Sequence, residues 1–486
     1  MSRTSVADRD WFSTGRAAAG SVTIRDCYTT FDPSTESPLA EVADFDDAGV
    51  DAVVRQSAED QVKWAKLPPR VRARHVREFA TALRANADEL ASLDALDAGL
   101  PRTAMLNDVE FAAEYLEIMC DLALDLGGRT IPASQGNLHY TINAPYGVVA
   151  RIVPYNHPLF FAASKLGPPL VAGNSVILKA PDQAPLSALR IGEIAAETLP
   201  CRVVSIISGS VPASRALVRH PLIRRIAFIG SDAVGRSIQR DAADAGVKNV
   251  SLELGGKNAM LVFDDADPVR AATGAVLGMN FGVTAGQSCG STSRLLVHES
   301  IAEEVVENVL KKIAEIRIGD PMDPAFTMGP LITRKQFDHV SSVVKAGCVD
   351  GAELITGGGH PDGENGTGFY FAPTVLTGVS PTNRAAQTEA FGPVLSVLTF
   401  KDEDEAVRIA NGVEFGLTAA VWTDRLDRAH RVAEQMDAGY VWINGTGRHF
   451  WGVPFGGWKD SGVGREEDAS ELLSFTQTKA VNVVMS

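Results

Sequence analysis

Cysteine is scarce in this chain. Five cysteines occur in 486 residues, an odd number with no C-x-x-C spacing: Cys27, Cys120, Cys201, Cys289 and Cys348. This usage disfavours a disulfide framework and a cysteine-based zinc site, and a reducing cytoplasm is the expected location. The nine histidines are scattered, and no cluster of His, Cys, Asp or Glu has metal-ligand spacing. We therefore predict no metal site.

Long apolar runs and basic blocks are missing as well. The most apolar stretch, Pro158 to Leu178, is broken by Lys165 and Asn174, so no run approaches the roughly 18 apolar residues of a membrane span. The segment from Met1 to Trp11 has no apolar core of a secretory signal. Lys and Arg number 45 against 60 Asp and Glu, a formal net charge of −15, which disfavours phosphate backbones. We expect neither membrane nor nucleic acid as a partner.

Strand-like and helix-like patterns alternate from residue 147 onward. Hydrophobic residues make up 45% of the chain, and its length corresponds to about three domains of roughly 150 residues. The predicted strands form two series, first Gly147–Val153, Ser175–Leu178, Val203–Ile207 and Arg225–Ile229, then Ala259–Phe263, Arg294–Val297, Val394–Phe400, Ala419–Trp422 and Tyr440–Asn444. Such alternation predicts βαβ units and parallel sheets. We predict an α/β fold with two tandem α/β domains.

The first third of the chain is less regular. After an irregular first stretch, apolar residues three or four positions apart predict one helix over residues 69–98, and a second helix follows over 105–126. Two segments with strand-like patterns, Arg129–Ala144 and Leu473–Val484, fit neither domain. Exposed strands are normally covered, so we expect them to pair with another subunit.

Three residues are candidates for chemistry. Cys289 lies between Gly286 and Gly290, where small neighbours leave the sulfur accessible to act as a thiolate nucleophile. Glu253 ends an apolar stretch and is costly to bury without a role or a partner, so it is either a general base or half of a salt bridge. Asn156, in the turn 154–158, is either an oxyanion donor or a structural amide. Nucleophile and base together are the minimum set for forming and hydrolysing an acyl-enzyme.

An ordered set of motifs spans nearly the whole chain. Its members are Pro154–Pro158, Lys179, Phe228–Ser231, Glu253–Lys257, Gly286–Cys289, Glu389–Pro393 and Pro454–Gly457. In this order, the set resembles the aldehyde dehydrogenase superfamily. The resemblance implies that Cys289 attacks the aldehyde to give a thiohemiacetal, whose oxyanion the Asn156 amide and the Cys289 N–H hold. Oxidation to a thioester and hydrolysis by water that Glu253 activates would follow. Lys165 and Glu466 match positions that some members use in proton transfer, or they are structural charges.

The resemblance implies a nicotinamide cofactor in a Rossmann-like domain, although the chain contains no G-x-G-x-x-G fingerprint. Lys179 would bond the adenosine ribose, and Glu389 the nicotinamide ribose. The remaining implied contacts are Ile152, Pro154, Tyr155, Asp182, Gly209, Gly230, Ser231, Leu254 and Phe391. A carboxylate at Asp182 accepts ribose hydroxyls and repels a 2′-phosphate. It therefore favours NAD, with NADP as the alternative because Asp is shorter than the Glu often found there.

The implied substrate pocket contains polar residues. It is formed by His157, Phe161, Ser164, Ser288, Arg448, His449 and Phe455. We expect a small-molecule substrate, either an aromatic aldehyde or a semialdehyde with an anionic group, for which Arg448 is the anchor unless it points to solvent. Alternatives are a coenzyme A-acylating or semialdehyde-specific dehydrogenase, and a catalytically silent protein of this fold. Glu253 favours hydrolysis to the free acid.

The resemblance also implies a division of the chain. An NAD-binding domain would comprise residues 1–126 and 146–253, and a catalytic domain residues 254–455. Residues 127–145 and 470–486 would form a small β element that joins subunits of a homodimer or homotetramer.

Overall fold

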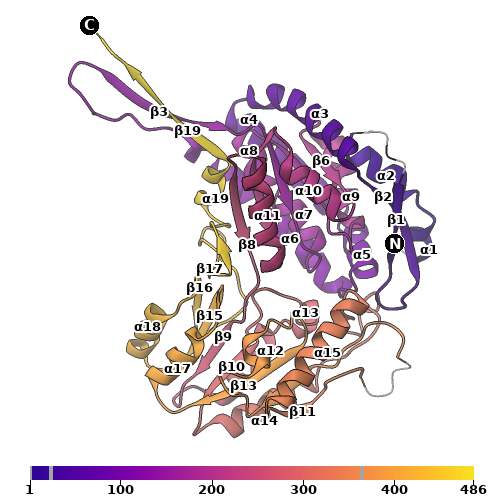
Figure 1. Cartoon of the computed structure of the whole chain (residues 1–486), viewed down its shortest axis with the longest axis vertical. Coiled ribbons are helices and arrows are strands. Elements are labelled where there is room, and N and C mark those ends of the chain that lie inside the picture. The colour runs from indigo at the N-terminus through magenta and orange to yellow at the C-terminus, as the bar shows by residue number, and fades with distance from the viewer. Residues whose placement is uncertain (1–2, 21–23, 25, 362–365, 486) are drawn as a thin grey trace.

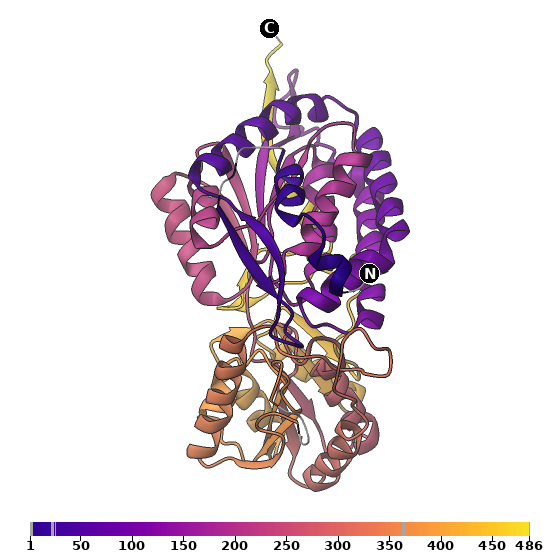
Figure 2. The same cartoon turned by 90° about the vertical axis from the view of Figure 1, so that its right-hand side faces the viewer.

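Two lobes and a projecting arm make up the molecule (Figures 1 and 2). A computed structural model of the chain describes residues 3–20, 24, 26–361 and 366–485. Met1 and Ser2, which begin the predicted NAD-binding domain, and Ser486, which ends the predicted β element, lie outside the described residues. Each lobe is built around a mostly parallel sheet with helices packed against it, so the predicted α/β fold class is confirmed.

The upper lobe contains a six-stranded sheet in the order β18-β8-β7-β4-β5-β6. Its strands are β4 (Val148–Ile152), β5 (Ser175–Lys179), β6 (Val204–Ile207), β7 (Ile223–Ile229), β8 (Asn249–Glu253) and the antiparallel edge strand β18 (Gly462–Val463). The helices between them are α7 (Pro158–Ser164), α8 (Gly167–Ala172), α9 (Leu186–Thr198), α10 (Val211–Arg219) and α11 (Asp232–Ala245). Strand order reverses between β4 and β7, and open α/β sheets bind ligands at the carboxyl edge beside such a switch point.

The first 126 residues are more regular than their sequence indicates. The elements there are α1 (Arg3–Ala7), α2 (Trp11–Ala18), β1 (Asp26–Phe31), β2 (Pro38–Asp44), α3 (Asp47–Ala65), α4 (Pro69–Ala85), α5 (Ala87–Asp97), α6 (Arg102–Asp121) and the 3-10 helix η1 (Leu122–Leu126). The expectation of an irregular first stretch was therefore wrong, because β1 and β2 form an antiparallel hairpin. Buried and exposed residues alternate only weakly along β1, so its sequence pattern does not mark it as a strand. The prediction of a single helix over residues 69–98 was also wrong, because the segment forms two helices, α4 and α5. Asn86 ends α4, with φ −108° and ψ 16°, and its side chain donates to the Ala82 carbonyl.

The lower lobe contains a seven-stranded sheet in the order β11-β12-β13-β10-β9-β15-β16, parallel except for β11. Its strands are β9 (Ala259–Val262), β10 (Arg294–His298), β11 (Glu353–Thr356), β12 (Thr374–Thr377), β13 (Val394–Phe400), β15 (Thr418–Trp422) and β16 (Tyr440–Ile443). The helices are α12 (Pro268–Gly278), α13 (Phe281–Thr284), α14 (Ala302–Ile313), α15 (Arg334–Val349), α16 (Arg384–Gln387), α17 (Glu403–Asn411) and α18 (Leu426–Gln435). Short strands β14 (Phe415–Gly416) and β17 (Trp458–Lys459) pair separately.

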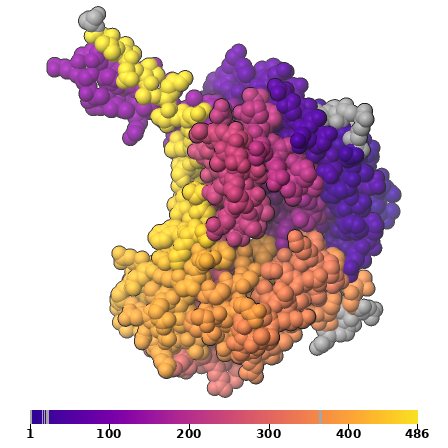
Figure 3. All heavy atoms as spheres, in the orientation of Figure 1, coloured from indigo at the N-terminus to yellow at the C-terminus, as the bar shows by residue number. Residues whose placement is uncertain are grey.

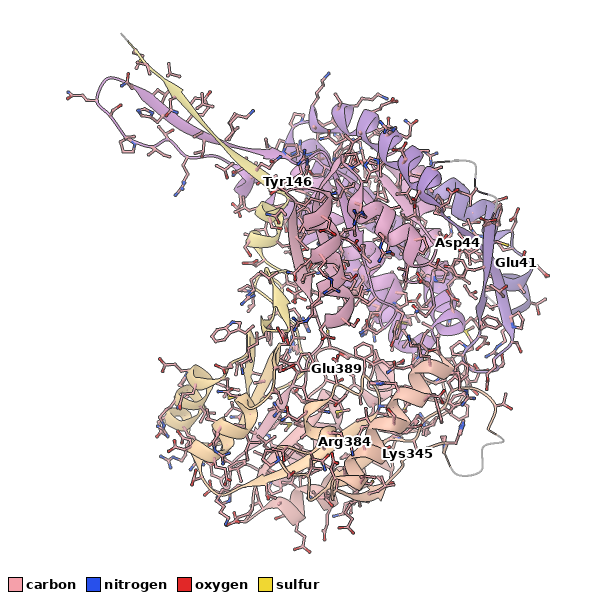
Figure 4. The ribbon with its side chains drawn as sticks, viewed as in Figure 1. Glu41, Asp44, Tyr146, Lys345, Arg384 and Glu389 are labelled. Atoms are coloured by element: carbon pink, nitrogen blue, oxygen red, sulfur yellow. The ribbon has the colours of Figure 1, made fainter. Side chains whose placement is uncertain are left out.

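The two sheets face one another end to end. Strand β8 ends at Glu253, and the chain passes through a short turn into β9 at Ala259. Carboxyl ends of the upper strands therefore meet amino ends of the lower strands. Cys289 precedes β10, and Glu389 precedes β13. Figure 4 shows Glu389 where the lobes meet. Segments distant in sequence converge at this junction.

The arm is a two-stranded antiparallel ribbon that projects from the upper lobe (Figures 1 and 3). Strands β3 (Leu138–Pro145) and β19 (Thr476–Val483) pair along their whole length, from Leu138 opposite Val483 to Pro145 opposite Thr476. Each strand therefore covers one edge of the other. Strand β19 begins at Thr476, after helix α19 (Ala469–Ser474), rather than at Leu473 as the sequence predicts. Within the described ranges, no helix combines the length and apolar content needed to cross a bilayer.

Candidate active site

Glu253 carries a buried carboxylate without a partner. It ends β8 and is 6% exposed, and neither carboxylate oxygen has a hydrogen-bond partner among the described residues. Burial, followed by the negative charge of Glu466, raises the pKa of Glu253 well above its usual value. Gly456 lies so close that a Cβ there would be 2.9 Å from Oε1. A carboxylate that is desolvated and unpaired is poised to take up a proton.

Cys289 lies in a loop that is held by hydrogen bonds from Asn258 and by close packing at Gly286. The Asn258 amide nitrogen donates to the Cys289 carbonyl at 2.7 Å and to the Ser291 carbonyl at 2.9 Å. Gly286 has φ +73°, and a Cβ there would collide with the Gly392 carbonyl, so only glycine fits. Burial raises the pKa of the Cys289 thiol to about 12, and the charges of Glu389 and Glu253 add to the effect. The thiol therefore needs a base to become nucleophilic.

Asn156 lies in the turn that follows β4 at the switch point. It is 3% exposed, and the neighbouring Tyr155 ring meets the Phe391 ring edge to face, with centroids 5.9 Å apart. Phe391 adopts φ +46°, in the left-handed region that side chains rarely occupy. Its loop thus brings the segment before β13 against the carboxyl end of β4.

Glu389 joins the same junction from the lower lobe. Its Oε1 accepts the Gly256 amide N–H at 2.8 Å, and a Cβ on Gly255 would collide with its carboxylate. Burial raises the pKa of Glu389 to about 7, against the opposing effects of the Gly256 N–H and Lys257. The turn after β8 is therefore shaped to receive this side chain.

The other predicted cofactor residues line the carboxyl edge of the upper sheet. Lys179 ends β5, forms an ion pair with Asp182 and donates to the Ala180 carbonyl at 2.8 Å. Beyond these two, Ile152 ends β4 and Pro154 follows it, Gly209 follows β6, Gly230 and Ser231 lie between β7 and α11, and Leu254 follows β8. Parallel strands thus bring all of these positions to one edge.

An aromatic cluster lies beside Asn156. His157 Nδ1 is 2.6 Å from the Asp108 carboxylate, and its ring meets Phe160 and Phe161 edge to face. Phe160 stacks on Trp451, with centroids 6.4 Å apart. Helix α7 and the loop before Phe455 therefore pack against each other through aromatic side chains.

Comparison with known proteins identifies the family. The model of the Aldehyde dehydrogenase family matches residues 21–481. The chain belongs to the aldehyde dehydrogenase family. It is 41% identical over 462 residues to aldehyde dehydrogenase tropH of Talaromyces stipitatus, covering 93% of this chain and 89% of that one. The predicted family and enzyme class, an NAD(P)-dependent aldehyde oxidoreductase, are confirmed.

Solved structures agree in fold with this family member. An aldehyde dehydrogenase from Bacillus cereus in complex with NAD+ superposes with a TM-score of 0.92 at 34% identity, covering 95% of this chain and 94% of that one. PnpE from Pseudomonas sp. WBC-3 superposes with a TM-score of 0.91 at 36% identity, covering 94% of both chains. PnpE is also known in complex with nicotinamide adenine dinucleotide.

The remaining predicted site residues of this aldehyde dehydrogenase differ in exposure. Phe455 is buried and packs against His449, with ring centroids 4.7 Å apart, and His449 Nδ1 lies 2.9 Å from Glu467. Arg448 is exposed, with its guanidinium 4.9 Å above the Phe450 ring. Ser164 is fully buried and donates to the Phe160 carbonyl at 2.6 Å, whereas Ser288 is half-buried.

Lys165 and Glu466 form a buried ion pair of 2.9 Å behind Glu253. Sequence reasoning missed the residues that complete their surroundings, above all Arg151 on β4, which lies 2.6 Å from Glu466. It also missed Asn258 and Asp108. An arginine inside the apolar strand Val148–Ile152 was the available signal for Arg151, because a buried charge requires a partner. No comparable signal marks Asn258 or Asp108.

Proposed function

We propose that this chain oxidises an aldehyde to a carboxylic acid, with NAD as the oxidant, through covalent intermediates on Cys289. The observation that carries the proposal is the unpartnered, buried carboxylate of Glu253, whose charge acts on the Cys289 thiol across the lobe junction. Nucleophile and base thus come from different lobes. Water-excluded surroundings strengthen their interaction.

Acylation begins with proton transfer from the Cys289 thiol to Glu253. The thiolate adds to the aldehyde carbon, so a C–S bond forms and the carbonyl oxygen becomes an oxyanion. The Asn156 amide, in the turn after β4, donates to this oxyanion. NAD, when bound, would supply the hydride acceptor for the same carbon, and loss of that hydride leaves a thioester on the Cys289 sulfur.

Deacylation uses the same base. Once its proton is released, Glu253 takes a proton from water, and the water oxygen adds to the thioester carbon. The C–S bond then breaks, the acid leaves and Cys289 returns as a thiolate. The unpaired oxygens of Glu253 fit this task, because a salt bridge would stabilise the ionised carboxylate and make it a weaker base.

The residues at the lobe junction fit a dinucleotide. Asp182 and Glu389 offer carboxylates for the hydroxyls of two riboses, and Lys179 offers an ammonium between β5 and Asp182. Ser231 immediately precedes α11, the helix that follows β7 at the switch point. Since the Asp182 carboxylate repels a 2′-phosphate, we propose NAD in preference to NADP.

The substrate is an aromatic aldehyde or a semialdehyde with an anionic group. Phe160, Phe161 and Trp451 supply apolar faces, and the His157 ring lies among them. Burial alone lowers the pKa of His157, but the adjacent Asp108 carboxylate outweighs burial and raises it. His157 therefore favours the cationic form, and exposed Arg448 is a second cation for an anionic substrate. Equal loss of activity of Arg448→Ala toward carboxylated and neutral aldehydes would remove Arg448 as an anchor.

An aldehyde panel tests the function. NADH formation is measured with aromatic, aliphatic, amino and carboxylated aldehydes, with and without coenzyme A, and the acid product is quantified. We expect free acid and no acceleration by coenzyme A, because Glu253 activates water. Acyl-coenzyme A as product would favour the acylating alternative. Absence of NADH formation in a folded, NAD-bound sample would favour a silent binding protein.

Assembly and location belong to the same proposal. We propose that residues 127–145 and 470–486 join subunits into a homodimer or homotetramer, beside an NAD-binding domain of residues 1–126 and 146–253 and a catalytic domain of residues 254–455. Apolar side chains exposed on the arm, such as Leu138, Ile142 and Val483, support this role. A reducing cytoplasm suits a protein whose reaction needs a free Cys289 thiol.

A further inference from the structure

Both carboxylate oxygens of Glu466 are already bound to cations. Oε1 accepts a hydrogen bond from Arg151 Nη1 at 2.6 Å, and Oε2 lies 2.9 Å from Lys165 Nζ. All three side chains are buried, at 1% exposure for Arg151, 2% for Lys165 and 8% for Glu466. Charge-assisted hydrogen bonds of this length are strong. A proton arriving at Glu466 would neutralise the charge that makes both of them strong.

A second carboxylate fixes the arginine. Glu471, in α19, forms an ion pair with the other terminal nitrogen of Arg151 and accepts a hydrogen bond from the Tyr115 hydroxyl. It also accepts the Glu467 amide N–H at 2.9 Å. Lys165 Nζ lies 4.7 Å above the Tyr115 ring and 3.9 Å from Glu471. The cluster therefore holds two cations and two anions in fixed positions.

We propose that Glu466 is a fixed negative charge that sets the basicity of Glu253 rather than a proton carrier, and that Arg151, held by Glu471, is the positioning residue that keeps it so. The inference rests on the proposed function, in which Glu253 is the base. Protonation of Glu466 would remove the negative charge that Arg151 and Lys165 both bind, so these two contacts oppose a role as proton carrier. Although burial raises it, Lys165 and Arg151 together lower the pKa of Glu466 to about 2, in keeping with a permanent anion.

The segment that carries Glu466 lies beside Glu253. The Phe455 N–H donates to the Glu466 carbonyl at 2.9 Å, and a Cβ on the next residue, Gly456, would be 2.9 Å from Glu253 Oε1.

The charges that face Glu253 come from several elements. After burial, Glu466 raises its pKa, Lys165 and Arg465 lower it, and Glu467 raises it. Removing the Glu466 charge should therefore lower the pKa of Glu253, and removing the Lys165 charge should raise it. If Glu466 and Lys165 act as fixed charges, their removal shifts the pKa of Glu253 in opposite directions. If they form a proton relay, loss of either one slows the same step.

The test compares pH profiles of kcat, together with the initial NADH burst that shows deacylation to limit turnover. We expect the acid limb of Glu466→Gln to move to lower pH and that of Lys165→Met to higher pH, each by about one unit, with plateau rates within about tenfold of the wild type. Plateau rates lowered about 100-fold or more in both variants, with unmoved acid limbs, would overturn the inference. A wild-type protein that forms no NADH with any aldehyde would overturn the proposed function and this inference with it.

Arg151 is tested by the variant Arg151→Gln combined with Glu471→Gln, which removes one cation and one anion. Only Lys165 then holds Glu466, so Glu466 should titrate together with Glu253 and the acid limb should steepen toward a two-proton dependence. A limb identical to that of the wild type would overturn the role of Arg151. Thermal melts confirm folding, and if the double variant does not fold, the opposite shifts of the single variants still decide the role of Glu466.

Arg225→Gln is the matched control. Arg225, on the adjacent strand β7, is 2% exposed and covers the same Phe475 ring as Arg151, at 4.6 Å against 4.9 Å. It donates to backbone carbonyls and to hydroxyls of Ser251 and Ser474 rather than to a carboxylate. This variant should lose thermal stability and keep the wild-type pH profile. A shifted profile would show that any buried arginine here has the same effect, which would overturn the assignment to Arg151.

Discussion

The side-chain amide of Asn258 fastens the loop that carries Cys289. Its nitrogen donates to the Cys289 carbonyl at 2.7 Å, while its oxygen accepts the Thr418 amide N–H at 3.0 Å. One buried amide thus connects the nucleophile to the start of β9 and to β15. Reactive geometry depends on this kind of support, because small displacements of a nucleophile cost large factors in rate.

Asn258→Ala should therefore lower both activity and stability. Loss of the amide removes the Asn258 hydrogen bonds to the Cys289 carbonyl and the Thr418 N–H, while the Ser291 carbonyl keeps the Ser293 N–H as a donor. This loss costs about 1–3 kcal/mol of unfolding free energy, and we expect kcat/KM to fall about 10- to 100-fold. Thermal melts and steady-state kinetics check this. Asn411→Ala is the control, since that side chain also bridges two backbone groups, Gln435 O and Asp437 N. A similar loss of activity in both variants would contradict a specific role for Asn258.

Cys289→Ala should abolish turnover, with a loss on the order of 10³-fold or more, because the proposed covalent intermediates form on its sulfur. Cys201→Ala, which changes a half-buried cysteine elsewhere, should retain activity. Since the pKa of Cys289 is raised to about 12, the thiol form dominates at pH 7. Alkylation of Cys289 in the cofactor-free protein should accelerate as pH rises from 7 to 10. A rate independent of pH would contradict the raised pKa.

Glu253→Gln should stall deacylation. We expect the initial NADH burst to be slower than in the wild type and steady-state turnover to fall about 10²- to 10⁴-fold, because both the Cys289 thiol and the attacking water lose their base. Stopped-flow absorbance at the NADH band measures both phases. In the wild type, turnover should fall as pH drops through the raised pKa of Glu253, because the base must be unprotonated. A burst as fast as that of the wild type would contradict the proton transfer from Cys289 to Glu253.

The same substitution should stabilise the fold. The pKa of Glu253 is raised in the folded state, so its ionisation destabilises the protein as pH rises above the unfolded value of about 4.3. Glu253→Gln should therefore raise Tm, and more at pH 8 than at pH 5. Differential scanning calorimetry at the two pH values checks the sign. A larger gain at pH 5 would show that the carboxylate has a stabilising partner.

Asp182→Ser should improve the use of NADP relative to NAD, because it removes the carboxylate that repels a 2′-phosphate. It also frees Lys179 from its ion pair, so the ammonium becomes available to the phosphate. The ratio of kcat/KM values for the two cofactors is the measurement. Asp182→Asn separates charge from size. An unchanged ratio in both variants would contradict this role of Asp182.

Ile142→Asp, on the arm, should weaken subunit association. Ile142 is 45% exposed and belongs to a ribbon that projects from the upper lobe, where an added carboxylate would be costly to bury. Sedimentation analysis measures the mass of the particle. Val247→Asp, at a valine that is 90% exposed and outside the arm, is the control. An unchanged mass of Ile142→Asp, or an equal loss in both variants, would contradict the assembly through the arm.

Local patterns in the sequence predicted much of this fold. Strands β4 to β7, and β9, β10, β13, β15 and β16, follow β-branched runs whose hydrophobic pattern is visible without any contact, whereas β8, β11, β12 and β14 were not predicted. Residues such as Cys289 and Glu253 also stood out, because glycine neighbours and an isolated carboxylate are local signals. The break at Asn86 and the hairpin β1–β2 were not visible, because their apolar residues are defined by the surfaces that they cover.

The sequence by itself determined the α/β elements and the family, and it pointed to the nucleophile and base that we propose. Only the tertiary structure decided their electrostatic surroundings. Arg151, Lys165, Glu466 and Glu471 come from four segments of the chain and meet only after folding. Burial multiplies the effect of each neighbouring charge, so the basicity of Glu253 depends on which charges folding places around it. A linear sequence contains no measure of those distances.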